Sequence, residues 1–241
     1  MVALSEGKIV SDGSDEVRIF DHPALIVWNM QNGIVSHVNN RETILPTIRD
    51  MIETAHKTEV PVVFSQHHNF PVKWMDPGMR DILADSGVDT QKGWMRLGST
   101  EWEIVPLLRP GETDLILPVH TPSFFQGTPL EHVLHNYNIH TLILVGTASH
   151  SGILLTARQA MMLGFAVVLV EDAIGGITPE EHARAMRLLA QGCEVMSATE
   201  VIERFNRNAS VSTIPTPLLG FKAKERSSSR SSDEGRHSRS K

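Results

Sequence analysis

The chain has 241 residues, 41% of them hydrophobic, so it is long enough to bury the core of one large domain. Its net charge of -6 combines an acidic body with a basic segment at residues 222–241, which argues against a nucleic-acid groove in the body. The single cysteine, Cys193, excludes an intramolecular disulfide and suits a reducing compartment.

In chain order, the first segment is a polar stretch, residues 1–20, which predicts a flexible arm without the apolar run of a secretory signal. Apolar runs typical of buried parallel strands then occupy residues 23–29, 60–66, 114–119, 140–146, 165–172 and 193–197. Helical spacing predicts helices between these runs, over residues 41–57, 79–84, 130–137 and 152–163.

Capping boxes mark two further helices. Thr178 and Glu181 open one of them, and Ser197 and Glu200 open the other. The last segment, residues 222–241, holds seven serines and no large apolar residue, and it predicts a disordered tail. Such a tail serves either as a solubilising end or as a docking or phosphorylation segment. Residues 21–221 are therefore expected to form one domain.

Strands and helices alternate along this domain, a pattern typical of α/β folds. We predict three layers, with a mainly parallel six-stranded sheet covered by helices on both faces. The sequence holds no apolar stretch long enough to span a membrane, so we expect a cytoplasmic protein without a membrane partner.

Ligands bind beyond the carboxyl ends of the strands in such sheets. Polar side chains follow four of the predicted strands at these ends: Asn29, Gln31, Gln66, His67, His68, His120, Ser123, Thr147, Ser149, His150 and Ser151. Gly152 opens the predicted helix after residues 140–146, where backbone N–H groups can bind an oxyanion. The sequence has neither G-x-G-x-x-G nor a P-loop, and we expect no cofactor.

Four ordered segments resemble the isochorismatase-like, or cysteine hydrolase, superfamily. They are "PALIVWNMQNGIV", "ILPVHTPSFFQGTPLEHVL", "LILVGTASHSGILLTARQAMMLGFAVVLVEDAIGG" and "TPEEHARAMRLL". The likeness runs from about residue 22 to residue 204. It implies a Rossmann-like topology, a cis peptide near Thr147–Ala148, a small-molecule ligand, and a homo-oligomer, either a dimer or a tetramer.

The resemblance also implies a reaction. In this family a cysteine attacks an amide carbon, an aspartate is the base, and a lysine stabilises the thiolate. These three positions fall on Gly152, Asn29 and Val119, so all three reactive groups are replaced. The branch that cleaves isochorismate also carries glycine at the cysteine position, but it needs the aspartate as an acid, and the Asn29 amide has no proton to give near neutral pH.

The replaced residues exclude ordinary thiol hydrolysis. Loss of a general acid costs about a hundred- to ten-thousandfold in rate. Cys193 offers no substitute, because it lies in the predicted sixth strand as a buried structural thiol. The cavity shape can nevertheless persist with its charge removed, since asparagine and aspartate are nearly isosteric.

Candidate catalytic residues are Asn29, His120 and His150, of which the two histidines are the remaining titratable groups. Candidate substrate-binding residues are Gln31, Gln66, Val119, Ser123, Phe125, Ala148, Ser149, Ser151 and Gly152. Each polar member has an ordinary structural alternative, such as a helix cap or a loop hydrogen bond. No metal site is expected, because His67 and His68 lack partners at ligand spacing.

Two functions stay open. One is an enzyme that acts on a small organic substrate by non-thiol chemistry: C–O or C–N hydrolysis, or a substrate-assisted rearrangement. The other is a catalytically inactive pseudoenzyme that binds a ligand or serves as an oligomeric interaction protein, since a fold does not guarantee its usual function.

Overall fold

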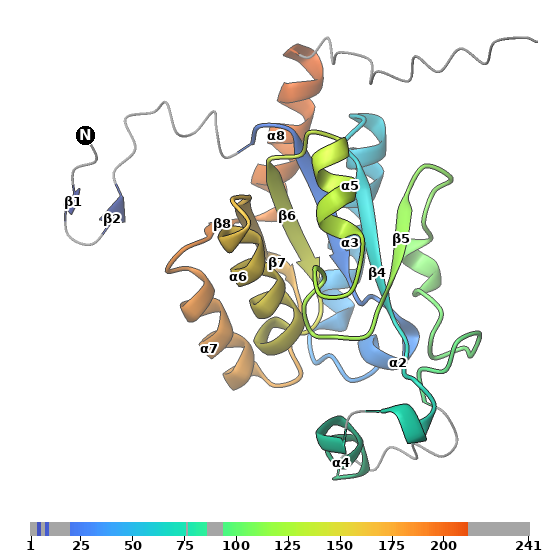
Figure 1. Cartoon of the computed structure of the whole chain (residues 1–241). Coiled ribbons are helices and arrows are strands. Elements are labelled where there is room, and N and C mark those ends of the chain that lie inside the picture. The colour runs from blue at the N-terminus through green and yellow to red at the C-terminus, as the bar shows by residue number, and fades with distance from the viewer. Residues whose placement is uncertain (1–3, 6–7, 10–19, 76, 86–93, 212–241) are drawn as a thin grey trace, which may run out of the picture.

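The computed structural model describes residues 4–5, 8–9, 20–75, 77–85 and 94–211 (Figure 1). Two short strands, β1 (Leu4–Ser5) and β2 (Lys8–Ile9), pair antiparallel within the predicted N-terminal arm. The rest of that arm and the predicted tail lie outside the described residues, so both remain predictions.

Within the described residues, the main sheet has six strands in the order β5-β4-β3-β6-β7-β8. Every neighbouring pair in it is parallel, which confirms the predicted fold class. The strand bounds are β3 (Pro23–Trp28), β4 (Val62–His67), β5 (Leu115–Val119), β6 (Thr141–Gly146), β7 (Ala166–Ile174) and β8 (Glu194–Met196). The chain order along the sheet reverses between β3 and β6, which is the switch point where α/β folds usually bind ligands.

Helices cover both faces of the sheet (Figure 1). One core cluster joins α3 (Arg41–Lys57) and α8 (Ala198–Val211) to one face, through residues such as Ile48, Phe205 and Val27. The other joins the opposite face to α5 (Leu130–Asn136), α6 (Leu154–Met162) and α7 (Pro179–Leu189). Strand residues alternate between the two clusters, as period-2 geometry requires.

Shorter helices connect these elements: α2 (Asn32–Val35), η1 (Val72–Trp74), α4 (Pro77–Asp85) and η3 (Pro106–Leu108). Residues 94–105, called here the covering segment, run beside the chain that follows β3. Backbone bonds from Asn32 N to Glu103 O and from Val105 N to Met30 O, each 2.9 Å, hold it there. None of the described helices is long and apolar enough to cross a membrane.

Both predicted capping boxes are confirmed. The Thr178 hydroxyl accepts from Glu181 N at 3.3 Å, and Ser197 N donates to the Glu200 carboxylate at 2.8 Å. The predicted helix over 152–163 is corrected in its first part, because a π-helical turn, η4 (Ser149–Ile153), precedes α6. Strand β7 also runs two residues past its predicted end, because a bulge displaces Glu171 and Asp172 outward before pairing resumes at Ile174.

Candidate functional site

Asn29 directly follows β3 at the switch point, with a left-handed backbone (φ 49°). Its N–H donates to Ser65 Oγ at 2.8 Å, and the Ser65 hydroxyl donates back to Asn29 Oδ1 at 2.7 Å. The amide oxygen is therefore held by a neighbouring strand. Because an amide neither gives nor takes a proton near neutral pH, Asn29 can only orient or hydrogen-bond a ligand.

The indole of Trp28 fills the space in front of Gly152. A β-carbon on Gly152 would overlap the indole atoms Nε1 and Cε2 and would lie 2.7 Å from Cζ2. Trp28 is 2% exposed, and Phe124 packs edge-on against its ring with centroids 5.4 Å apart. The indole thus occupies the position that the side chain of a nucleophile at residue 152 would need.

Val119, the last residue of β5, is fully buried in the same apolar cluster as Trp28 and Phe124. The position at which the resemblance expects a lysine is therefore an apolar packing position. A cation placed there would be taken out of water, at a cost that only a paired carboxylate could offset. Asn29, at the position where the resemblance expects an aspartate, is uncharged and supplies none.

The turn between β6 and α6 has the backbone that the resemblance implied, because the Thr147–Ala148 peptide is cis. Its N–H groups are partly used within the protein: Ser149 N donates to Gly175 O at 3.0 Å, and Ser151 N donates to Ala148 O at 3.2 Å. The Ser149 hydroxyl and His150 Nδ1 are buried without a hydrogen-bond partner among the described residues. The Ser149 side chain therefore does not cap the following helix, which was the structural role expected as the alternative to substrate binding.

Gln31 joins three segments at the carboxyl edge of the sheet, called here the mouth of the site. Its Nε2 donates to His67 O at 2.8 Å and to Trp102 O at 2.6 Å, and its Oε1 accepts from His67 N at 2.7 Å. Gln66 Nε2 also donates to Trp102 O, at 3.2 Å. Both amides thus serve the packing of the covering segment against β3 and β4.

Two further candidate residues also have internal partners. Ser123 Oγ donates to Gln159 Oε1 of α6 at 2.6 Å, and the buried Phe125 ring stacks on Phe165 with centroids 5.9 Å apart. Their predicted role in binding stays a prediction, while their contacts give each of them a structural role.

Three histidines gather where β4 and β5 end. The ring centroids of His68 and His120 lie 4.1 Å apart, and His120 stacks on Phe70 at 4.1 Å. His120 Nδ1 lies 3.1 Å from His68 O, so this nitrogen carries the proton and donates, which leaves Nε2 available. Burial lowers the pKa of His67, and burial together with His120 lowers the pKa of His68.

Cys193 lies just before β8, at the amino end of that strand and away from the mouth. It is 8% exposed, its Sγ contacts Met161 Sδ at 3.6 Å, and burial raises the pKa of its thiol to about 11. This confirms a buried structural thiol. The described residues contain no group of three or more His, Cys, Asp or Glu placed to hold a metal ion.

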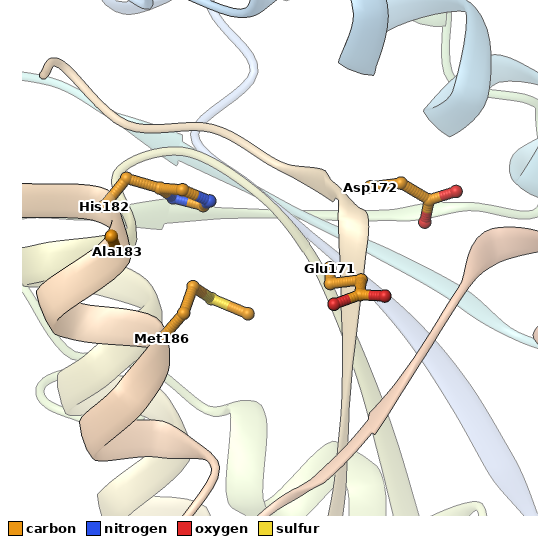
Figure 2. A pocket seen from close by; sticks show the side chains of 5 residues that line it. All are labelled: Glu171, Asp172, His182, Ala183 and Met186. Carbon is orange, nitrogen blue, oxygen red and sulfur yellow. The ribbon is translucent and has the colours of Figure 1, made fainter. Parts of the chain in front are cut away.

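A separate cavity of about 340 Å³ lies between β7 and α7 (Figure 2). His182, Ala183 and Met186 of α7 line one side, and Glu171 and Asp172 of the β7 bulge line the other. Asp172 points away from the His182 ring in Figure 2 and accepts from Ala198 N at 2.7 Å, which holds the start of α8. Its carboxylate is thus used to position a helix.

Sequence reasoning missed three residues that close the site: Trp28, Ser65 and Phe70. Only Trp28 carried a signal, since a tryptophan directly before Asn29 is out of place in an otherwise aliphatic strand. The contact of Trp28 with Gly152 joins residues 124 positions apart, and strand alternation alone does not show which side chains meet at that range.

Comparison with known proteins fits this geometry. The profile of the isochorismatase domain matches residues 23–200. Nicotinamidase 3 of Arabidopsis thaliana is 28% identical over 172 residues, which cover 70% of this chain and 81% of the relative. The ureidoacrylate amidohydrolase RutB of Enterobacter sp. is 25% identical over 183 residues, covering 68% and 80%.

Solved structures share the fold. A cysteine hydrolase from Pseudomonas syringae pv. phaseolicola superposes with a TM-score of 0.69 at 22% identity, covering 77% of this chain and 93% of that structure. Because the family profile matches residues 23–200, most of the sequence, the chain belongs to the isochorismatase family.

Proposed function

We propose that this chain is a non-hydrolysing member of the isochorismatase family, which acts by binding rather than by turnover. The observation that carries the proposal is the Trp28 indole in front of Gly152, where a nucleophile would project. A missing side chain alone would leave space for a water or a reactive ligand group. An indole that is 98% buried at that point removes the space as well.

The neighbouring groups support the same conclusion. The Asn29 carbonyl oxygen is bonded to Ser65, the Gln31 amide is bonded at both ends, and Val119 is buried among apolar side chains. Catalysis needs groups that are free to change partners or protons as charge develops. The Asn29 oxygen and both ends of the Gln31 amide are instead bonded within the protein.

The second candidate is an enzyme that uses non-thiol chemistry, and His120 favours it. His120 Nδ1 donates to His68 O, so its Nε2 is oriented as an acceptor on an exposed ring. An imidazole held in one tautomer by a backbone carbonyl is a sound general base. It would act on a substrate that lies away from Gly152, since the Trp28 indole blocks access to that residue.

An assay of product release separates the two functions. The full chain is incubated with nicotinamide, ureidoacrylate and isochorismate, and release of ammonia or pyruvate is followed against a blank without protein. We expect no turnover above the blank. Turnover that is lost in His120→Gln but kept in His132→Gln, an exposed histidine on α5, would overturn the proposal in favour of non-thiol catalysis.

Binding is measured on the same compounds by isothermal titration calorimetry. Heat of binding without product formation is the result expected of a binding protein. If none of the three compounds binds or reacts, the chain is not a binding protein for these small molecules. The mass of the chain in solution then tests whether it serves as an oligomeric interaction protein.

A further inference from the structure

Burial disfavours a positive charge on the rings of His67 and His68. Hydrogen bonds to Asn69 and to the Val119 backbone favour the charge on His67, but burial has the larger effect on its pKa. The His67 ring is largely enclosed, and Nδ1 of His68 is buried without a partner among the described residues. The charged groups that act on the pKa of either ring are other imidazoles, and their effect is to lower it. The acidic residues of the covering segment, Glu101 and Glu103, are exposed and form no described ion pair with these rings.

The same histidines also hold segments of the mouth together. The chain of contacts starts at His67, whose backbone is bonded on both sides by the Gln31 amide. His67 Nε2 lies 3.1 Å from Asn69 Oδ1, and Asn69 Nδ2 donates to Trp94 O of the covering segment at 3.1 Å. The His67 ring therefore links β4 to the covering segment.

A second chain of contacts joins the two strand ends. His68 N donates to Val119 O at 3.2 Å, and His120 Nδ1 donates to His68 O at 3.1 Å. Phe70 stacks on the His120 ring and is itself 47% exposed, so this stack lies at the surface. These contacts hold residues 68–75, called here the histidine segment, over the ends of β4 and β5.

We propose that His67, His68 and His120 form an acid-sensitive latch, which holds the histidine segment and the covering segment over the mouth at neutral pH and releases them on acidification. Protonation places a charge on an enclosed ring at His67. It also places a charge on His68, whose buried Nδ1 has no partner among the described residues and whose ring centroid lies 4.1 Å from that of the His120 imidazole. Release exposes the rings of His67 and His68 to water, where an unperturbed histidine has a pKa of about 6.5.

The direction of the effect follows from proton linkage. Burial lowers the pKa of His67 and His68 in the closed form, so the released form binds more protons, and acid favours release. The change begins as pH falls through about 6.5 and is complete below the lowered pKa values. Each of these histidines adds up to about a tenfold rise in the opening equilibrium per pH unit within that window.

Hydrogen–deuterium exchange of the full chain at pH 7.5 and pH 5.5, corrected for intrinsic exchange rates, tests the latch. We expect protection to fall at least several-fold in residues 67–75 and 94–105, while β6 keeps its protection. The variant His67→Gln with His68→Phe keeps an amide donor for Asn69 and a ring beside His120, and it should lose most of the acid response. His37→Gln, at an exposed histidine after α2, is the matched control and should respond as the unmodified chain does.

An acid response of the same size in the double variant would overturn the proposal, as would uniform loss of protection across β6. A second measurement on the unmodified chain does not depend on the variants folding. Histidine ring resonances are titrated by NMR and assigned with single variants, and a pKa at or above the ordinary value for both His67 and His68 would also refute the latch.

Discussion

Replacing Gly152 by alanine tests whether the indole of Trp28 closes the nucleophile position. Glycine inside a helical turn costs about 1 kcal/mol relative to alanine, so with open space the substitution would stabilise the protein. Here the new β-carbon overlaps two indole atoms and lies 2.7 Å from a third. Because Trp28 is 2% exposed and is packed by Phe124, the ring has little room to move away.

The expected size of the effect follows from these two opposing contributions. Inserting a carbon into a well-packed core costs about 1–3 kcal/mol, and occasionally more. The overlap with two indole atoms places the cost at the upper end of this range, about 3 kcal/mol, and the gain of about 1 kcal/mol offsets part of it. We therefore expect Gly152→Ala to lower the free energy of unfolding by about 2 kcal/mol, a change opposite in sign to that of an open site. Gly152→Cys should be worse, because the sulfur extends further into the ring.

Urea unfolding followed by circular dichroism measures this change, since tryptophan fluorescence would be altered by changes at Trp28. Gly111→Ala is the control, because a β-carbon there would meet His56 at 3.4 Å, an ordinary contact, and it should change stability little. Trp28→Leu combined with Gly152→Ala should be more stable than the sum of the single changes, by about 1–3 kcal/mol of coupling. A Gly152→Ala protein as stable as the unmodified chain would refute the closed position.

Three further predictions concern other parts of the chain. Gln31→Leu removes three hydrogen bonds at a fully buried amide and leaves their backbone partners unpaired, so it should lower the free energy of unfolding by at least about 3 kcal/mol in urea; a loss under about 1 kcal/mol would contradict the role of Gln31 as a tie. Burial lowers the pKa of His182, so the unfolded chain binds more protons below about pH 6.5, and the free energy of unfolding decreases as pH decreases through that range. His182→Gln should flatten this part of the plot of unfolding free energy against pH, and an unchanged slope would contradict the contribution of His182. Cys193, with a thiol pKa of about 11, should react with a thiol reagent at pH 7.5 only in denaturant, and rapid labelling of the native protein would show that the thiol is reachable.

The fold was predictable from local signals because each of them acts over a few residues. The run from Ala24 to Val27 is apolar on both faces, as a central parallel strand must be. Thr178 and Glu181 set the start of α7 through a bond that spans three residues. Such signals need no knowledge of which strand lies beside which.

The site was predictable only as a set of strand ends. The sequence places Asn29, His120 and Gly152 at the carboxyl edge of the sheet, and the structure confirms that edge for all three. What fills the space between them depends on side-chain direction and size across distant segments. The left-handed backbone at Asn29 and the π turn before α6 both change these directions, and neither follows from hydrophobic periodicity.

The blocked position at Gly152 and the proposed histidine latch involve two different kinds of group in the mouth, those whose charge is fixed near neutral pH and those whose charge depends on pH. The Trp28–Gly152 contact removes the space for a nucleophile, and the Gln31 and Asn29 amides are bonded within the protein, so none of these groups changes its charge between pH 5 and 8. The charge of the His67 and His68 imidazoles, in contrast, depends on pH, and burial lowers the pKa of both. We therefore expect the covering segment and the histidine segment to respond to acidity rather than to a bound amide.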